Sequence, residues 1–210
     1  MTIKNDLYFL REPRTGGTLF ESLIRHKVGD KFTCFTHHQI EFIKNIPVNP
    51  NTVILRSARK NLVEHFLSIR FLQDFPKTTR FTNFTLDNPT DVLFSKMIGQ
   101  KITISKIEVT DWLDAKIQNE FIFNDLVKNF QHQTVFYEDM GKPTHMPILG
   151  LQHIVFFNHK EYTIKLPDYK KEVFTNYDQV VKWMEGSLNA LTKKYNAKEL
   201  FKHWSSHSSS

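Results

Sequence analysis

The apolar positions of the 210-residue chain alternate between short runs typical of buried strands and stripes typical of helices. Residues 7–10 and 52–55 are continuous apolar runs, and the second is rich in β-branched side chains, which predicts buried parallel strands. Apolar residues three and four apart follow each run, at 19–24 and 62–69, as helices require. The order predicts an α/β protein with three layers around a central, mostly parallel sheet.

Weaker patterns extend this order of elements. Three further strands are predicted, at residues 31–36, 134–140 and 152–157. A long helix, either continuous or broken near Gln118, is predicted over about 111–130, with Ile122, Leu126 and Phe130 on one face. Asn176 precedes a final amphipathic helix as its predicted N-cap, with Gln179 as capping-box partner. The turn-rich residues 73–90 predict a loop over a site.

Length and composition limit the protein class. The length favours a single domain over residues 1–204, followed by a disordered polar tail at 205–210. The content of 40% hydrophobic residues and 19 Phe favours a globular protein. The formal charge of +6 suits an anionic ligand. A single cysteine, Cys34, excludes an intramolecular disulfide and is expected in the core.

Targeting patterns are absent from the sequence. No apolar run approaches the length of a membrane span, and no signal-peptide pattern precedes the first predicted strand. We therefore expect a cytoplasmic protein of bacterial or viral type, with no membrane partner and no nucleic-acid partner.

A glycine-containing stretch separates the first predicted strand from the first predicted helix. It reads Glu12, Pro13, Arg14, Thr15, Gly16, Gly17, Thr18, Leu19. Gly16 and Gly17 let the backbone approach a ligand closely, and a helix N-terminus behind them offers free N–H donors. Arg14 adds a planar fork for phosphate oxygens, and the hydroxyls of Thr15 and Thr18 can donate to them. The stretch is a phosphate loop or a plain turn, and it lacks the Gly-Lys-Ser/Thr ending of a Walker A loop.

The run from Pro13 to Leu19 resembles the 5′-phosphosulfate loop of sulfotransferases that use the sulfate donor PAPS. That loop typically reads Pro-Lys/Arg-Ser/Thr-Gly-Ser/Thr-Thr, so Gly17 is the departure here. The change removes one hydroxyl and keeps the backbone donors. The resemblance implies the P-loop-like sulfotransferase fold, with residues 14–19 holding the phosphosulfate.

Two histidines and a carboxylate follow the predicted strand 31–36: His37, His38 and Glu41. They could be metal ligands, although no third cluster has metal spacing, or a surface turn, or they could include a general base for an acceptor hydroxyl or amine. Cytosolic sulfotransferases place their catalytic His after a Thr here, and Thr36-His37 is similar. Carbohydrate sulfotransferases use a Glu followed by an aromatic pair, to which His38 or Glu41 is nearer. We expect His37 first, His38 second and Glu41 third.

Arg56 stands at the carboxyl end of a predicted strand, where open α/β sheets bind ligands. The layout resembles the sulfotransferase 3′-phosphate motif, which is a strand, Arg-Asp/Asn-Pro, and a Ser eight residues after the Arg. Here Ser57 and Ala58 replace the second and third residues, and Glu64 occupies the Ser position, where a carboxylate would repel phosphate. Possible substitutes for the missing contacts are Ser57, Arg59, Lys60 and Ser68. Alternatively, Lys60 and Glu64 form an i,i+4 pair on a solvated helix face.

Two later stretches extend the resemblance. Tyr137-Glu138-Asp139-Met140 resembles the Tyr-Glu-Asp-Leu strand of sulfotransferases, although by itself it could be the acidic strand end that holds magnesium in ATPases. Residues 170–180 resemble the segment in which a Val/Ile-x-Asn-Tyr stretch opens the family's final helix, after a loop that closes over the nucleotide. The resemblance makes Lys165, Lys170 and Lys171 candidate phosphate contacts, and a solvated basic run is the alternative.

The sequence thus predicts a sulfotransferase that moves a sulfuryl group from PAPS to a hydroxyl or amine and releases PAP without a metal. The style of the loop favours a carbohydrate acceptor, by resemblance. One alternative is a P-loop kinase or NTPase, which the missing loop lysine disfavours. The other is a non-catalytic nucleotide-binding module derived from a sulfotransferase, which Glu64 favours.

Overall fold

The computed structural model describes residues 6–13, 20–21, 24–25, 32–74, 101–139, 143–146, 151–155, 169–199 and 201–204. The chain divides into two compact units: residues 1–60 with 117–157, and residues 61–116 with 158–210. Among the helices so described, none is long and apolar enough to cross a membrane.

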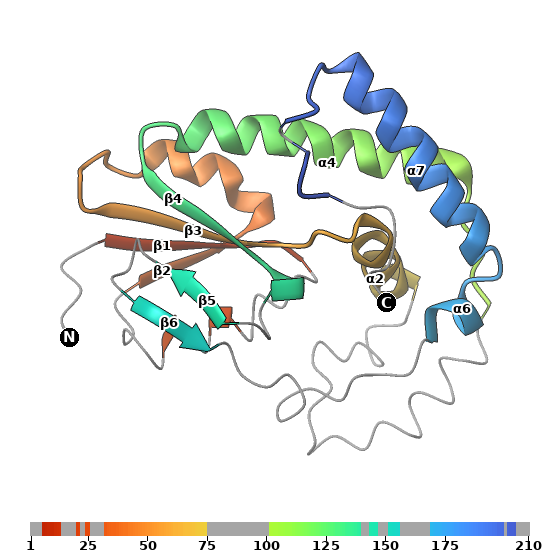
Figure 1. Ribbon diagram of the computed structural model, residues 1–210, viewed down its shortest axis with the longest axis horizontal. Coiled ribbons are helices and arrows are strands. Elements are labelled where there is room, and N and C mark those ends of the chain that lie inside the picture. The colour runs from red at the N-terminus through yellow and green to blue at the C-terminus, as the bar shows by residue number, and fades with distance from the viewer. Residues whose placement is uncertain are drawn as a thin grey trace. The chain divides into compact units, whose positions relative to one another are not determined.

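The first unit contains a four-stranded parallel sheet with the strand order β2–β1–β3–β4 (Figure 1). Its strands are β1 (Asp6–Arg11), β2 (Phe32–Thr36), β3 (Thr52–Ala58) and β4 (Gln131–Phe136). All seven residues of β3 are buried, which explains its continuous apolar run. The predictions of an α/β protein and of a parallel central sheet are confirmed. β4 ends four residues before the predicted strand does, and a 3-10 turn, η3 (Tyr137–Asp139), follows it.

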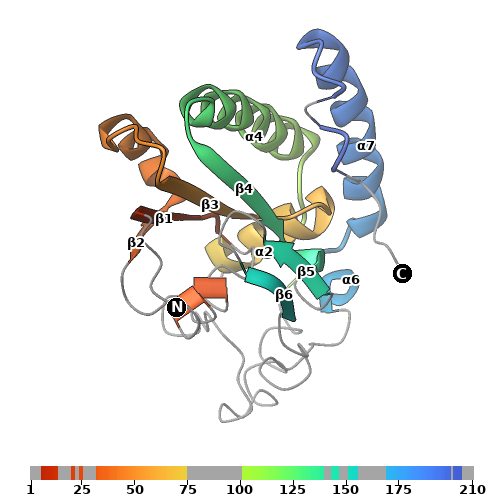
Figure 2. The same ribbon diagram turned by 60° about the vertical axis from the view of Figure 1, so that its left-hand side comes forward.

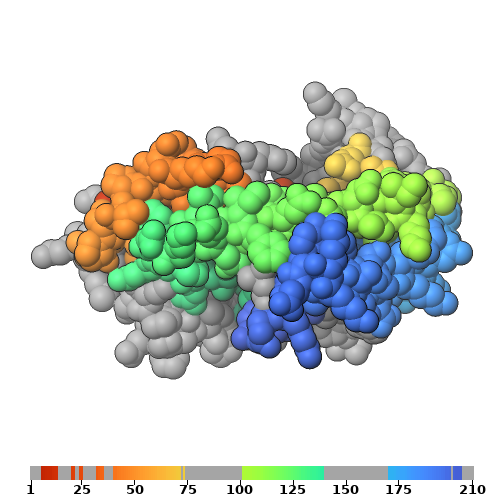
Figure 3. Space-filling model, turned by 90° about the horizontal axis from the view of Figure 1, so that it is seen from above, coloured from red at the N-terminus to blue at the C-terminus, as the bar shows by residue number. Residues whose placement is uncertain are grey.

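Apolar side chains cover both faces of this sheet. On one face, Phe9 packs edge-on against Phe20 from the helical residues after β1, with ring centroids 5.1 Å apart. The other face carries the 3-10 helix η1 (His37–Asn45) and the second half of helix α4 (Lys106–Val127), seen from above in Figure 3. The buried cluster there consists of Leu10, Phe35, Ile40, Ile43, Ile46, Ile54, Phe123 and Val127. Burying each such side chain contributes about 1.5–3 kcal/mol to folding.

The crossover connections change face between β1 and β3. Phe20, from the described helical residues between β1 and β2, packs on the Phe9 face, whereas η1, between β2 and β3, lies on the opposite face. Right-handed crossovers require this change, because the chain moves in opposite directions along the sheet. The carboxyl ends of β1 and β3 therefore flank a topological switch point, where open α/β sheets bind their ligands.

A second, two-stranded sheet belongs to the same unit (Figure 2). Strands β5 (Pro143–Met146) and β6 (Leu151–Val155) pair antiparallel. The strand predicted at 152–157 is thus present and begins one residue earlier.

The second unit contains α2 (Leu62–Asp74), the first half of α4, α6 (Tyr169–Val173) and α7 (Tyr177–Lys194). α4 begins five residues before its predicted start because Ser105 and Glu108 form a capping box. The Ser105 N–H donates to Glu108 Oε2 at 2.7 Å, and the Glu108 N–H donates to Ser105 Oγ at 3.2 Å. The Ser-x-x-Glu spacing is the sequence signal for this start.

The predicted apolar face of α4 is confirmed in part, since Leu126 and Phe130 pack against the buried cluster, but its most buried residues lie one position further along. Ile122 is 37% exposed, whereas Phe123 and Val127 are buried against the sheet. Glu120 precedes Phe123 by three residues and therefore lies on the buried stripe.

Asn176 occupies the N-cap position of α7, as predicted, but its side chain does not cap the helix. Its Oδ1 accepts the Ile104 N–H at 3.1 Å, and its Nδ2 donates to the Ile104 carbonyl at 2.7 Å. The predicted capping box with Gln179 is therefore wrong. The Asn176 side chain instead binds the backbone of Ile104, next to the parallel bridge between Ile102 and Phe174.

Replacing Asn176 by Ala should lower the free energy of unfolding by about 1–3 kcal/mol, because its two hydrogen bonds to the N–H and the carbonyl of Ile104 are lost. Urea unfolding followed by circular dichroism measures the change. Asn176→Asp keeps the acceptor and loses the donor, so an intermediate loss is expected. Asn189→Ala, at an exposed position of the same helix, should cause no loss. Equal effects at the two positions would contradict the assignment.

Candidate functional site

Polar and charged residues follow every strand of the parallel sheet at its carboxyl edge. In sheet order they are His37 after β2, Glu12 after β1, Arg59 and Lys60 after β3, and Tyr137, Glu138 and Asp139 after β4. Arg11 is in register with Thr36 and Ser57, and Ala58 with Phe136. The four segments therefore leave the sheet side by side, around the switch point between β1 and β3.

The predicted phosphate loop, residues 14–19, lies outside the described residues, but the structure describes the residues that flank it. Arg11, the last residue of β1, donates from Nη1 to Glu21 Oε2 beyond the loop at 3.0 Å. Arg25 binds the other oxygen of the Glu21 carboxylate at 2.8 Å. Glu12 lies 3.6 Å from the Arg56 guanidinium. Ion pairs thus anchor the chain on both sides of the loop.

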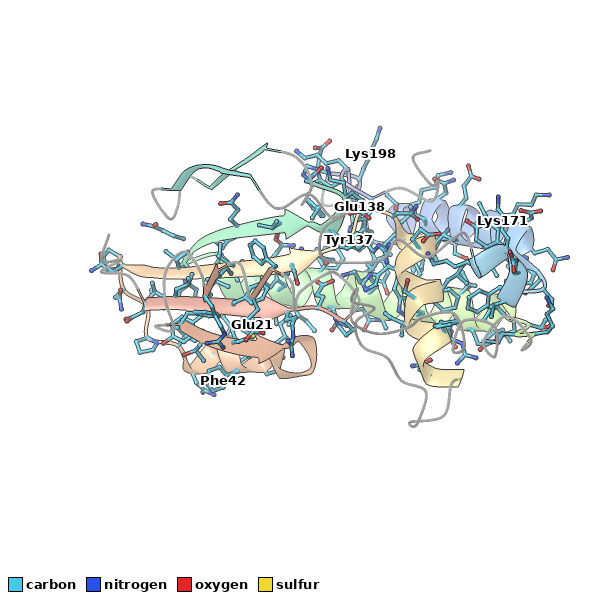
Figure 4. All side chains as sticks on the ribbon, turned by 90° about the horizontal axis from the view of Figure 1, so that it is seen from below. Glu21, Phe42, Tyr137, Glu138, Lys171 and Lys198 are labelled. Carbon is cyan, nitrogen blue, oxygen red and sulfur yellow. The ribbon has the colours of Figure 1, made fainter. Side chains whose placement is uncertain are left out.

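Glu21 also contacts the single cysteine of the chain, and Figure 4 shows Glu21 beside the sheet. The Cys34 thiol donates to Glu21 Oε2 at 3.4 Å. Burial and the adjacent carboxylate raise the pKa of Cys34 to about 11. Burial raises the pKa of Glu21 as well, but hydrogen bonds from Arg25 and Cys34 and the charges of Arg11 and Arg25 outweigh it and lower this pKa. Cys34 is therefore a protonated thiol at neutral pH, with no feature of a nucleophile.

Arg56 points into the interior of the first unit, and its side chain is 7% exposed. Its Nη1 donates to both carboxylate oxygens of Glu120, at 3.0 and 2.9 Å, and its guanidinium stacks 4.1 Å from the centre of the Phe123 ring. Burial lowers the pKa of Arg56, but the charges of Glu120 and Glu12 outweigh it and raise this pKa above its ordinary value.

Arg56 follows Ile54 on the strand by two residues and therefore shares its sheet face, toward α4. Ser57, on the opposite face, is fully buried. The observed partners of Arg56 are thus internal carboxylates, and its contact with a 3′-phosphate remains a prediction.

A charged network joins the ends of β3 and β4. The Lys60 N–H donates to Glu138 Oε2 at 2.9 Å, and the Lys60 Nζ lies 2.7 Å from Asp139 Oδ2. Arg59 Nε lies 3.6 Å from Glu138 Oε1, and its guanidinium stacks 4.7 Å from the centre of the Tyr137 ring. Tyr137 and Glu138 are labelled just beyond β4 in Figure 4. Both carboxylates of the predicted acidic strand end thus bind cationic groups of the neighbouring strand end.

The candidate bases follow β2. The backbone of His37 and His38 begins η1 at the carboxyl edge, and only the backbone of these two residues is described. Glu41 is 58% exposed and forms an ion pair with Lys44 one turn later. No cluster of three potential metal ligands occurs among the described side chains.

The remaining predicted contacts belong to the second unit. Glu64 and Lys170 form an ion pair, with side chains 17% and 12% exposed, so the charge of Glu64 is neutralised within the protein. Lys60, the other residue of the alternative i,i+4 pair, has its Nζ 2.7 Å from Asp139 Oδ2. Lys171 is exposed and its Nζ lies 5.6 Å from the centre of the Tyr177 ring. Lys165 and the greater part of the predicted loop 73–90 lie outside the described ranges.

Comparison of the chain with protein-family models, curated proteins and solved structures finds no significant match. The residues and geometry of the carboxyl edge are therefore the basis for a functional proposal.

Arg56→Ala should lower the free energy of unfolding by about 3–5 kcal/mol, because it leaves the buried carboxylates of Glu12 and Glu120 without their shared cation. Urea unfolding measures the loss. The more exposed Arg70–Glu108 pair offers a control, since Arg70→Ala should cost no more than about 1 kcal/mol. Similar losses in the two variants would show that Arg56 is not a buried structural cation.

Alkylation of Cys34 in the folded protein at pH 8 should be about 100-fold slower than in the urea-unfolded chain, because a pKa of about 11 in place of 9.0 lowers the thiolate fraction by that factor. Mass spectrometry of iodoacetamide labelling measures the rate. Glu21→Gln should accelerate labelling of the folded protein, since it removes the carboxylate and leaves two arginines nearby.

The pKa of Cys34 is higher in the folded than in the unfolded protein, so the thiol stabilises the fold below about pH 9, and its contribution is lost as the pH rises toward 11. A rate independent of Glu21 would contradict the assigned contact.

Proposed function

We propose that the carboxyl edge of the parallel sheet binds a phosphorylated nucleotide, and that the protein is a PAPS-dependent sulfotransferase. One observation carries the proposal. The sequence Pro-Arg-Thr-Gly-Gly-Thr follows β1, whose carboxyl end flanks the topological switch point, and ion pairs anchor the described residues before and after this stretch. Such anchoring reduces the entropy lost when a loop closes on an anion.

Each part of the edge has a proposed role. Backbone N–H groups of residues 14–19 and the Arg14 guanidinium hold the 5′-phosphosulfate and stabilise charge that develops on the bridging oxygen. His37 follows β2 directly and takes the acceptor proton as the acceptor oxygen or nitrogen attacks sulfur. The proton moves to the imidazole, the S–O bond to the nucleotide breaks, and PAP leaves. His38 and Glu41 are the alternatives for the base, and a carbohydrate is the favoured acceptor.

The position of Arg56 supports a second candidate, a nucleotide-binding module without catalysis. Its guanidinium is bound by two carboxylates, so the residue that the family motif assigns to the 3′-phosphate has a structural use. This candidate predicts nucleotide binding without turnover. The kinase alternative has less support, because Glu138 and Asp139 bind Arg59 and Lys60, and those cations compete with magnesium for the same carboxylates.

Calorimetric titration should show micromolar binding of PAP, with ADP at least about tenfold weaker. Arg14→Ala should weaken PAP binding by about 10- to 100-fold, because a charge-assisted hydrogen bond contributes about 1.5–3 kcal/mol. Lys198→Ala removes one positive charge at an exposed position outside the sheet and should leave the affinity unchanged.

The same samples decide between the candidates. Magnesium-dependent ATP binding without PAP binding would replace the sulfotransferase proposal with a kinase. Consumption of PAPS with a carbohydrate or alcohol acceptor that is lost in His37→Ala supports catalysis. Binding of PAP with no turnover, unchanged in a His37→Ala plus His38→Ala variant, would identify the module.

A further inference from the structure

The turn after β3 is held by the segment after β4, and one carboxylate makes two of the contacts. Glu138 accepts the backbone N–H of Lys60 through Oε2 at 2.9 Å. Its other oxygen lies 3.6 Å from Arg59 Nε. The two partners are consecutive residues, so a single side chain fixes both the backbone and the guanidinium of this turn.

Aromatic rings support the same two cations. The Arg59 guanidinium lies over the Tyr137 ring at 4.7 Å, and the Lys60 Nζ lies 5.2 Å from the centre of the Phe136 ring. The side chains of Arg59 and Glu138 are 13% and 24% exposed, so solvent screens their interaction less than on an open surface. The cations are thus held in defined positions at the edge, beside the switch point.

We propose that Glu138 is a positioning residue for anion binding: it holds the Arg59–Lys60 turn so that the turn presents its cations to a phosphate group at the carboxyl edge. This inference rests on the proposed function, because it assigns residues to the same nucleotide site. The burial of Arg56 supports the inference, because it leaves other cations near the end of β3 to contact a ligand. Arg59 and Lys60 are the next cations along the chain, and they lie beyond the end of this strand.

Charge alone would give Glu138 the opposite role. The formal charges of the two cations and the two carboxylates in this network sum to zero. A carboxylate beside an anion site also repels the ligand. If Glu138 acted only through its charge, removing that charge would tighten binding. If it acts by position, an uncharged side chain with an oxygen in the same place should keep the affinity for the anion. A carboxylate whose oxygens are displaced should not.

Two substitutions separate these roles. Glu138→Gln removes the charge and keeps an oxygen that can accept the Lys60 N–H. Glu138→Asp keeps the charge but shortens the side chain by one methylene group, which moves the carboxylate oxygens away from the Lys60 N–H. Each variant, the wild-type protein and the exposed control Glu199→Ala are titrated with PAP and with 5′-AMP, which lacks the second phosphate. Hydrogen exchange of the Lys60 amide reports on the hydrogen bond directly.

We expect Glu138→Asp to weaken PAP binding about tenfold and 5′-AMP binding less than about threefold, with faster exchange at Lys60. Glu138→Gln should bind PAP within about threefold of the wild-type protein, or more tightly, with a protected Lys60 amide. The inference is wrong if Glu138→Asp binds PAP as tightly as the wild-type protein, or if only Glu138→Gln weakens PAP binding. Either result leaves the proposed function standing. If the wild-type protein binds neither nucleotide, the proposed function fails, and the positioning role fails with it.

Discussion

The buried ion pair between Arg56 and Glu120 is the constraint on which the first unit depends. It joins the central strand β3 to helix α4, and the same guanidinium lies near Glu12 at the start of the candidate phosphate loop. A buried cation with good carboxylate partners adds modest net stability, but losing either partner is costly. The pair therefore fixes which face of β3 meets α4, and the same guanidinium holds Glu12, which precedes the predicted loop.

The carboxyl edge repeats this use of paired charges in a more exposed setting. Glu21 bridges the segments around the loop, and Glu138 bridges the ends of β3 and β4. Each carboxylate holds arginines or lysines that would otherwise sample many rotamers. These ion pairs restrict the side chains in the unliganded protein, and such restriction lowers the conformational entropy that any binding at this edge would cost.

The second unit shows how one polar side chain can replace a longer hydrogen-bonding pattern. Asn176 bonds both the N–H and the carbonyl of Ile104, as a neighbouring strand would. The bridge between Ile102 and Phe174 continues this pairing. Glu64, which occupies a 3′-phosphate motif position, and Lys170, a candidate phosphate contact, form an ion pair in the same unit. These residues thus have partners within the protein, and their contacts with a nucleotide stay predictions.

The sequence by itself determined the α/β class and the four strands of the parallel sheet, because apolar runs act through neighbours a few positions away. It did not indicate β5, and the phosphate loop stays a prediction. It also carried the Ser105-x-x-Glu108 start of α4, and Glu120 on an apolar stripe signalled a buried charge. Only the tertiary structure decided the ionic partners. Arg56 and Glu120 are 64 residues apart, and Lys60 and Glu138 are 78 apart. The sequence around a charged side chain does not identify its ionic partner, because the partner is whichever oppositely charged group the fold brings within a few ångströms.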